Sequence, residues 1–191
     1  MARAFLICGI ILNWMLSPAH AVEQTLSLDP AATKISFTLG STLHTVHGTL
    51  QLDEGTIVFD DELGTASGGV VIDAASAETG NRKRDKKMHH KVLASETHPL
   101  IVFTPQKMQH RLVDDGSGRI LLGGTVSVHG VEHAVDLDAT VSRRGQRITA
   151  SFDLPVPFVE WGMEDPSVFV FRTDKEVLVH VDLQGTLEVT P

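Results

Sequence analysis

The sequence predicts an all-β fold. Three observations lead to this prediction: apolar and polar residues alternate over many short runs, turn residues separate those runs, and a single segment carries helical spacing. Alternation with a period of two is typical of a strand with one buried and one solvent-facing side. About eight or more such strands with at most one substantial helix fit two architectures, a β-sandwich and a closed barrel.

The first 21 residues are typical of a cleavable signal peptide. Arg3 precedes an apolar run, and Ala19 and Ala21 are the small residues at the two positions that signal peptidase reads. The run has about 12 residues, whereas a membrane-spanning helix needs roughly 20. We therefore expect cleavage near Ala21, a periplasmic or secreted location, and a single mature domain over residues 22–191.

The composition limits the classes of function. The only cysteine, Cys8, lies in the expected signal peptide, so the mature domain would have no disulfide and would depend on a buried core. The chain carries 24 Asp and Glu against 16 Lys and Arg, a net charge of −8. This charge argues against general nucleic-acid binding, which depends on the neutralisation of phosphates.

Strand candidates follow one another along the mature chain. Within residues 34–39, Ile35, Phe37 and Leu39 alternate with polar neighbours, which predicts that these three side chains share one face. The same alternation marks residues 132–141, 147–156 and 177–183. The remaining strand candidates are residues 24–28, 43–52, 55–60, 68–74, 100–109 and 118–128.

Turn residues separate these runs at short intervals. The predicted turns are Asp53-Glu54-Gly55, residues 114–118, His129-Gly130 and Arg144-Gly145. They fit hairpins between sequential antiparallel strands. The sequence has no repeat of fixed period, low-complexity segment or linker, which indicates one domain.

Residues 76–95 are the exception to the strand pattern and predict a short amphipathic helix. Ser76 and Thr79 are candidate caps, and Met88 and Val92 fall at helical spacing. The segment also gathers six of the basic residues of this acidic chain, namely Arg82, Lys83, Arg84, Lys86, Lys87 and Lys91. Such a charge run is typical of a solvated helix face, although a binding surface for an anionic group also fits.

Five weak motifs in order resemble the YceI-like family of secreted lipid-binding proteins. They are "ISFTLGSTLHTVHGTLQLDEGTIVFD", "IDAASAETGNRKRDKKM", "HPLIVF", "GGTVSVHGVEHAVDLDATV" and "VEWGMEDPSVFVFRTDKEVLVHVDL". None is catalytic or unique by itself, and the resemblance depends on their order and spacing over residues 26–189.

The resemblance implies an elongated, antiparallel, eight-stranded, lipocalin-like barrel with one short helix that flanks or caps it. It also implies that the interior holds an isoprenoid lipid such as a polyprenyl phosphate or an isoprenoid quinone. A barrel of about eight strands either is filled by side chains or holds one small ligand. The candidate interior residues are Ile35, Phe37, Leu39, Val70, Ile72, Ile120, Leu122, Val126, Ile148, Phe152, Leu154 and Trp161.

A lipid headgroup would need polar partners at one end of such a barrel. The candidates are Asn81, Arg82, Arg84, Lys86 and Lys87, because a phosphate accepts charge-assisted hydrogen bonds from such side chains. A quinone would need only one or two neutral donors. Asp85 matches the "R-D" pair of the family and equally fits a structural contact that fixes the helix on the barrel.

The histidines raise an enzymatic alternative, which would be metal-dependent or acid–base. Catalytic zinc normally has three protein ligands, so the grouping to test is His129 and His133 with either His89 or His90. The chain contains neither a G-x-S-x-G elbow nor a glycine-rich phosphate loop followed by a helix. We therefore expect no catalytic residues, no bound metal and no cofactor other than the lipid ligand.

A third interpretation is an interaction module with a packed core. The basic segment 82–91 would then dock on an acidic partner or make transient contact with a membrane surface. An elongated barrel with an apolar edge could also pair as a homodimer.

Overall fold

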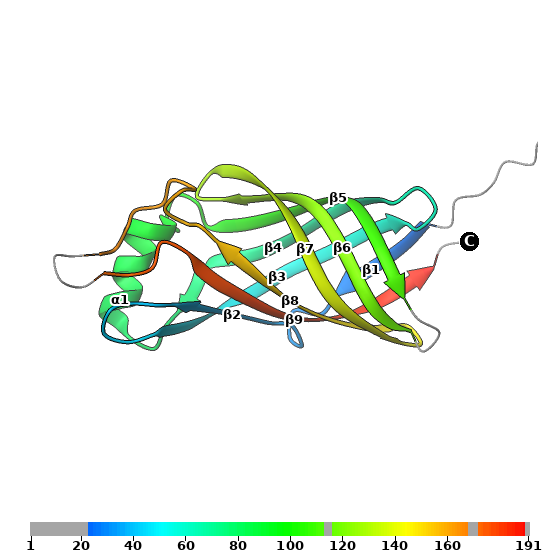
Figure 1. Cartoon of the computed structure of the whole chain (residues 1–191), viewed down its shortest axis with the longest axis horizontal. Coiled ribbons are helices and arrows are strands. Elements are labelled where there is room, and N and C mark those ends of the chain that lie inside the picture. Colours follow the sequence, from blue (N-terminus) through cyan, green and yellow to red (C-terminus); the bar gives the residue numbers. More distant parts are fainter. Residues whose placement is uncertain (1–22, 113–115, 168–171, 190–191) are drawn as a thin grey trace, which may run out of the picture.

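The computed structural model describes residues 23–112, 116–167 and 172–189 of the 191-residue chain. The expected signal peptide, residues 1–21, lies outside the described residues. Figure 1 shows an elongated barrel with a short helical segment at one end. The strands are β1 (Glu23–Leu28), β2 (Lys34–Leu39), β3 (Val46–Asp60), β4 (Thr65–Glu78), β5 (Leu100–Leu112), β6 (Ser117–Val128), β7 (Val131–Arg144), β8 (Arg147–Val156) and β9 (Val177–Val189).

These nine strands occupy eight positions around a closed antiparallel barrel. β1 and β2 both pair with β3 and β9, so they form the two halves of one position, separated by the turn at residues 29–33. From β3 to β9 each strand pairs with its neighbours in sequence, and β9 closes the ring against β1 and β2. The barrel implied by the family resemblance is confirmed, and the sandwich is excluded.

The helical segment consists of α1 (Arg82–Lys87) and a π-helical turn, η1 (Met88–Leu93). The predicted helix over residues 76–95 is too long at its start, because β4 continues to Glu78. The Ser76 hydroxyl donates to the Asp73 carbonyl and accepts from the Gln51 N–H, so Ser76 belongs to the strand and is not a cap. The cap is Asn81, whose side-chain oxygen accepts from the backbone N–H groups of Lys83 and Arg84.

The predicted turn at Asp53-Glu54-Gly55 is wrong, because β3 runs without interruption from Val46 to Asp60. A register shift against β4 lies between Leu52 and Glu54, which is a β-bulge rather than a chain reversal. A Cβ on Gly55 would lie 2.6 Å from Leu28 Cδ1. The glycine therefore allows two strands to pack closely. The prediction was wrong because glycine beside acidic residues is also the composition of a turn.

The real β3–β4 turn lies at residues 61–64. The buried Asp60 carboxylate accepts from the N–H groups of Glu62 at 2.8 Å and Leu63 at 2.9 Å. The turns at His129-Gly130 and Gly145 are confirmed, since these residues have φ angles of 53°, 77° and 64°. Residues 114–115 of the remaining predicted turn lie outside the described part of the chain.

The inward apolar side chains form three clusters along the barrel. At the end opposite the helix, Ala139, Val141, Ile148 and Leu187 form a buried cluster. Toward the helix the apolar side chains form two further clusters, around Ile35 and around Phe103. Within the described residues, no helix is long and apolar enough to cross a bilayer.

Candidate functional site

A cavity of about 580 Å³ runs from the helix end into the barrel, and its lining extends as far as Leu28 and Ile57. Every strand contributes at least one lining side chain, and η1 adds Met88, Val92 and Leu93. The lining is almost entirely apolar. Because inward and outward positions alternate along each strand, the sequence alternation produces this apolar interior directly.

Most of the predicted interior residues border the cavity. These are Ile35, Phe37, Leu39, Val70, Ile72, Leu122, Val126, Phe152, Leu154 and Trp161. The barrel therefore is neither hollow throughout nor filled throughout, since a cavity occupies one part and packed side chains fill the other.

Ile120 and Ile148 do not border the cavity. Both belong to the packed cluster at the opposite end, where Ile148 contacts the group formed by Val141 and Leu187. The alternation predicts correctly that they point inward, but it carries no information on depth along the barrel. In the structure they help to close that end, and their contact with a ligand stays a prediction.

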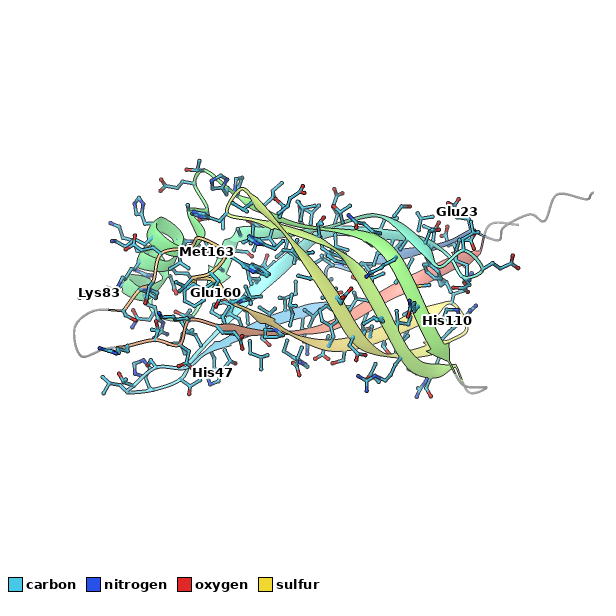
Figure 2. All side chains as sticks on the ribbon, turned by 45° about the horizontal axis from the view of Figure 1, so that its top comes forward. Glu23, His47, Lys83, His110, Glu160 and Met163 are labelled. Carbon is cyan, nitrogen blue, oxygen red and sulfur yellow. The ribbon has the colours of Figure 1, made fainter. Side chains whose placement is uncertain are left out.

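The polar lining residues gather at the helix end, apart from Thr33 in the β1–β2 turn. We call this group the mouth: Ser41, Thr42, His44, Thr79, Arg84, Lys87, Arg172 and Thr173. Thr42 and His44 are exposed, so the cavity approaches solvent here. Figure 2 places Lys83 and Met163 at this end and His110 and Glu23 at the other.

Two of the five predicted headgroup residues, Arg84 and Lys87, border the cavity. The Arg84 guanidinium donates to the Thr79 hydroxyl at 2.7 Å and to the Thr79 carbonyl at 2.9 Å. The Lys87 ammonium donates to the Pro166 carbonyl at 2.6 Å. Both cations thus hold the mouth together while they place positive charge beside the apolar interior.

The other three predicted headgroup residues do not border the cavity. Asn81 caps α1, and Arg82 and Lys86 are exposed on the outer side of the helix. The helical period explains this, because positions 84, 87 and 88 share one face whereas 82 and 86 lie on another. Asp85 accepts from the N–H and hydroxyl of Thr79, which gives it the structural role that the sequence left open.

Trp161 forms part of the cavity wall on the segment that follows β8. Its ring stacks on the His133 imidazole with centroids 4.2 Å apart and an interplanar angle of 3°. Buried Phe158 and Met163 anchor the segment on either side of Trp161. Both also line the cavity, and alternation could not predict this because they lie outside any alternating run.

The histidines of the grouping to test have separate contacts. The His89 Nδ1 lies 2.9 Å from the Ser95 hydroxyl, whereas His129 Nδ1 faces the Leu93 carbonyl and His133 stacks on Trp161. Among the described residues, no group of three His, Cys, Asp or Glu side chains is placed to share a metal ion. The geometry gives no support to the grouping of His129, His133 and His89 or His90 as a metal site.

The acidic residues beside Trp161 also have separate partners. The Glu164 carboxylate accepts from the Lys91 ammonium at 2.8 Å in an exposed pair. Hydrogen bonds from Ser167 lower the pKa of Asp165 below its ordinary value. Each carboxylate therefore stabilises the segment near the mouth. These contacts do not form the pair of carboxylates that an acid–base enzyme would use.

Comparisons with known proteins agree with this fold. A family model described as the YceI-like domain matches residues 26–185. No curated protein matches the sequence at a significant level.

Two solved structures share the barrel at low sequence identity. BcnA from Burkholderia cenocepacia superposes with a TM-score of 0.66 at 18% identity, over 83% of this chain and 99% of that chain. A polyisoprenoid binding domain from Saccharophagus degradans, implicated in plant cell wall breakdown, superposes with a TM-score of 0.66 at 20% identity, over 85% of this chain and 98% of that chain. At such identities the likeness shows the fold, and the match of the family model to most of the sequence shows that the chain belongs to the YceI-like domain family.

Proposed function

We propose that the protein binds an amphiphilic isoprenoid lipid, with the tail in the barrel cavity and the headgroup at the mouth. The observation that carries this proposal is the apolar cavity of about 580 Å³ whose polar lining gathers at one end. An amphiphile has the same division between a long apolar part and a small polar end. The neighbouring structure described as a polyisoprenoid binding domain supports the choice of lipid class.

The size and chemistry of the cavity suit this ligand. Small-molecule sites commonly measure about 300–1,000 Å³ and are mostly apolar with a few convergent polar groups. Each buried methylene contributes about 0.8 kcal/mol, so a few isoprene units supply ample affinity without any polar contact along the tail. Thr79, Arg84 and Lys87 then provide hydroxyl and cationic groups for either a phosphate or a quinone oxygen.

The proposed role is carriage of the lipid through an aqueous compartment rather than catalysis. With the signal peptide expected at residues 1–21, that compartment would be the periplasm or the cell exterior. A closed barrel removes the tail from water during transit, and the mouth gives the exchange route. The process in this case is binding and release, which requires neither a nucleophile nor a metal.

The first test is native mass spectrometry of the mature protein, followed by organic extraction of whatever co-purifies. We expect a bound isoprenoid of defined mass, which would also identify the headgroup as phosphate or quinone. Protein that purifies without lipid and fails to take up added polyprenyl phosphates or isoprenoid quinones would contradict the proposal.

A matched pair of variants ties uptake to the cavity. Leu122 borders the cavity, whereas its neighbour Leu121 on β6 is exposed on the outside. We expect Leu122→Trp to occupy part of the cavity and reduce isoprenoid uptake at least tenfold, since about 1.4 kcal/mol corresponds to a factor of ten and several methylenes would be displaced. Leu121→Trp should leave uptake unchanged, and equal uptake by both variants would place the lipid elsewhere.

A further inference from the structure

Leu43 is an exposed leucine at the mouth. It lies in the loop between β2 and β3, borders the cavity and is 67% exposed. The loop is held in place, because the Thr42 N–H donates to the Arg172 carbonyl and the Asp174 N–H donates to the Gly40 carbonyl, both at 2.9 Å. The Ser41 hydroxyl also donates to the His44 carbonyl at 2.5 Å. A fixed loop therefore presents an apolar side chain to solvent at the entrance of an apolar cavity.

Exposure of a single leucine is common on protein surfaces, so the surroundings of Leu43 decide its meaning. Leu63, in the β3–β4 turn at the opposite end, is 70% exposed and serves as a comparison. Its turn contains Asp60, Asp61 and Glu62, whereas the loop of Leu43, residues 41–45, contains no acidic residue. Of these two leucines, only Leu43 has no acidic residue within its own loop, although Asp174 of a neighbouring segment lies against Gly40.

The outer face of α1 adds positive charge to the same end of the barrel. Arg82, Lys83 and Lys86 are exposed and, within the described part of the chain, make no ion pair or side-chain hydrogen bond. Asp85, the one acidic residue of α1, turns inward to Thr79. Figure 2 places Lys83 at this end of the molecule. An overall acidic protein thus directs unpaired cations outward beside its cavity mouth.

We propose that the mouth docks on the surface of an anionic lipid bilayer. Arg82, Lys83 and Lys86 would contact the headgroups, and Leu43 would enter the interface. Basic residues close to an anionic membrane each strengthen attachment, and one apolar side chain adds to this. This inference rests on the proposed function, because docking in this orientation brings the cavity against the source or destination of the lipid.

A lipid surface fits these features better than an acidic protein. Leu43 is both a lining residue of the cavity and an exposed residue of the rim, so a tail that leaves the bilayer would meet a continuous apolar path. Docking of these cations on an acidic protein would need no such continuity. Binding to vesicles and to a soluble acidic polymer separates the two kinds of partner.

The test is flotation of the mature protein with vesicles of phosphatidylcholine alone and of phosphatidylcholine mixed with phosphatidylglycerol. We expect binding to the mixed vesicles only, with a loss of about tenfold or more in Arg82→Gln/Lys83→Gln/Lys86→Gln, because each basic residue contributes to the attraction. The control variant Arg143→Gln/Arg144→Gln/Arg147→Gln removes the same charge from three exposed arginines at the β7–β8 hairpin and should bind normally. Equal losses in both variants would show that binding follows net charge alone and would overturn the docking geometry.

The two leucines give the second comparison. Leu43→Ser should weaken vesicle binding severalfold, whereas Leu63→Ser should not. Binding to soluble polyglutamate as strong as to the mixed vesicles, together with normal vesicle binding by Leu43→Ser, would indicate an acidic protein surface and overturn the proposal.

Uptake of detergent-solubilised isoprenoid separates this proposal from the proposed function. The variant of Arg82, Lys83 and Lys86 should take up lipid normally from detergent, because these side chains do not border the cavity. Wild-type protein that binds vesicles but never takes up isoprenoid would contradict lipid carriage and leave docking intact. Protein that takes up isoprenoid but ignores anionic vesicles would overturn docking alone.

Discussion

At the scale of single residues, the cations at the mouth show how charge is placed beside an apolar interior. Arg84 and Lys87 each border the cavity and each donate to a backbone carbonyl, of Thr79 and Pro166 respectively. A charged donor bound to a carbonyl is held in position but keeps its positive charge, because the carbonyl is neutral. The two side chains therefore stabilise the mouth and still attract an anionic headgroup.

His180, on the outer face of the barrel, gives a pH-dependent prediction. Its Nδ1 lies 2.7 Å from Asp153 Oδ1, and its Nε2 lies 3.5 Å from Asp182 Oδ1. The hydrogen bond with Asp153 is the main cause that raises the pKa of His180 above its ordinary value. Burial opposes this rise, and the nearby charges of Asp182 and Asp153 add to it. The stabilisation from this contact is therefore fully present below about pH 6.5 and disappears as pH rises through the raised pKa.

Replacement of Asp153 tests this contact. In Asp153→Asn we expect the pKa of His180, measured by NMR titration, to fall toward the ordinary value. Urea unfolding should then show the variant less stable than wild type at about pH 5.5 and equal to it at about pH 8.5, with only a small difference because the pair is exposed. An unchanged pKa of His180 in this variant would mean that Asp153 does not stabilise the protonated imidazole.

At the scale of elements, the helical segment depends on the barrel for its stability. Helices shorter than about 12–15 residues are marginal in water, and α1 with η1 falls at that limit. Met88 and Val92 face the cavity, while Lys87 and Lys91 connect the segment to Pro166 and Glu164. The segment is thus fixed on its inner side and at the neighbouring loop, which leaves its outer face for the exposed cations.

The cap at Asn81 gives a prediction for this element. Its side-chain oxygen accepts from the N–H groups of Lys83 at 3.1 Å and Arg84 at 3.2 Å. Asn81→Ala should cost about 1 kcal/mol of local stability, because two helix donors lose their partner. We expect faster hydrogen exchange over residues 82–93 and unchanged exchange in the strands.

Asn81→Asp is the matched control, since aspartate caps helices as well as asparagine does. It should retain the wild-type exchange pattern. Faster exchange in both variants would show that the amide N–H₂ of Asn81, rather than its oxygen, supports the segment.

At the scale of the whole molecule, sequence reasoning predicted the faces of the strands well and positions along the barrel poorly. Ile148 and Leu154 lie on the same inward face of β8, yet only Leu154 borders the cavity. Periodicity specifies a face and not a depth, and depth is set by contacts with side chains of the neighbouring strands, such as Val141 on β7 and Leu187 on β9. The same limit explains Leu43, because no local pattern marks a loop residue as the rim of a cavity.

The sequence also does not show whether a glycine allows close packing between strands or forms a turn. Gly55 with its acidic neighbours has the composition of a turn, but the contact with Leu28 that requires it crosses between β3 and β1. His129-Gly130 was predicted correctly, since there the positive φ angles are a local requirement of the hairpin. Local conformational requirements could therefore be predicted from the sequence. Contacts between strands far apart in the sequence could not, because the closed barrel creates them.

The division of the barrel into a packed end and a hollow end gives the last prediction. Ile148 is 8% exposed and surrounded by the cluster that closes the packed end, whereas Leu122 borders the cavity. Ile148→Ala should lower the free energy of unfolding by about 2–4 kcal/mol, because it leaves a void among packed side chains. Leu122→Ala should cost less, because one side of its side chain already faces open space.

Lipid uptake should reverse this order. We expect Ile148→Ala to take up isoprenoid as wild type does at temperatures where it is folded, because its void is separated from the ligand. Leu122→Ala should shift the preferred tail length, as the wall of the cavity recedes. Urea unfolding and uptake of isoprenoids of graded length measure the two effects on the same samples. Loss of uptake in folded Ile148→Ala would mean that the tail reaches the packed end, and the two halves of the barrel would then form a single binding site.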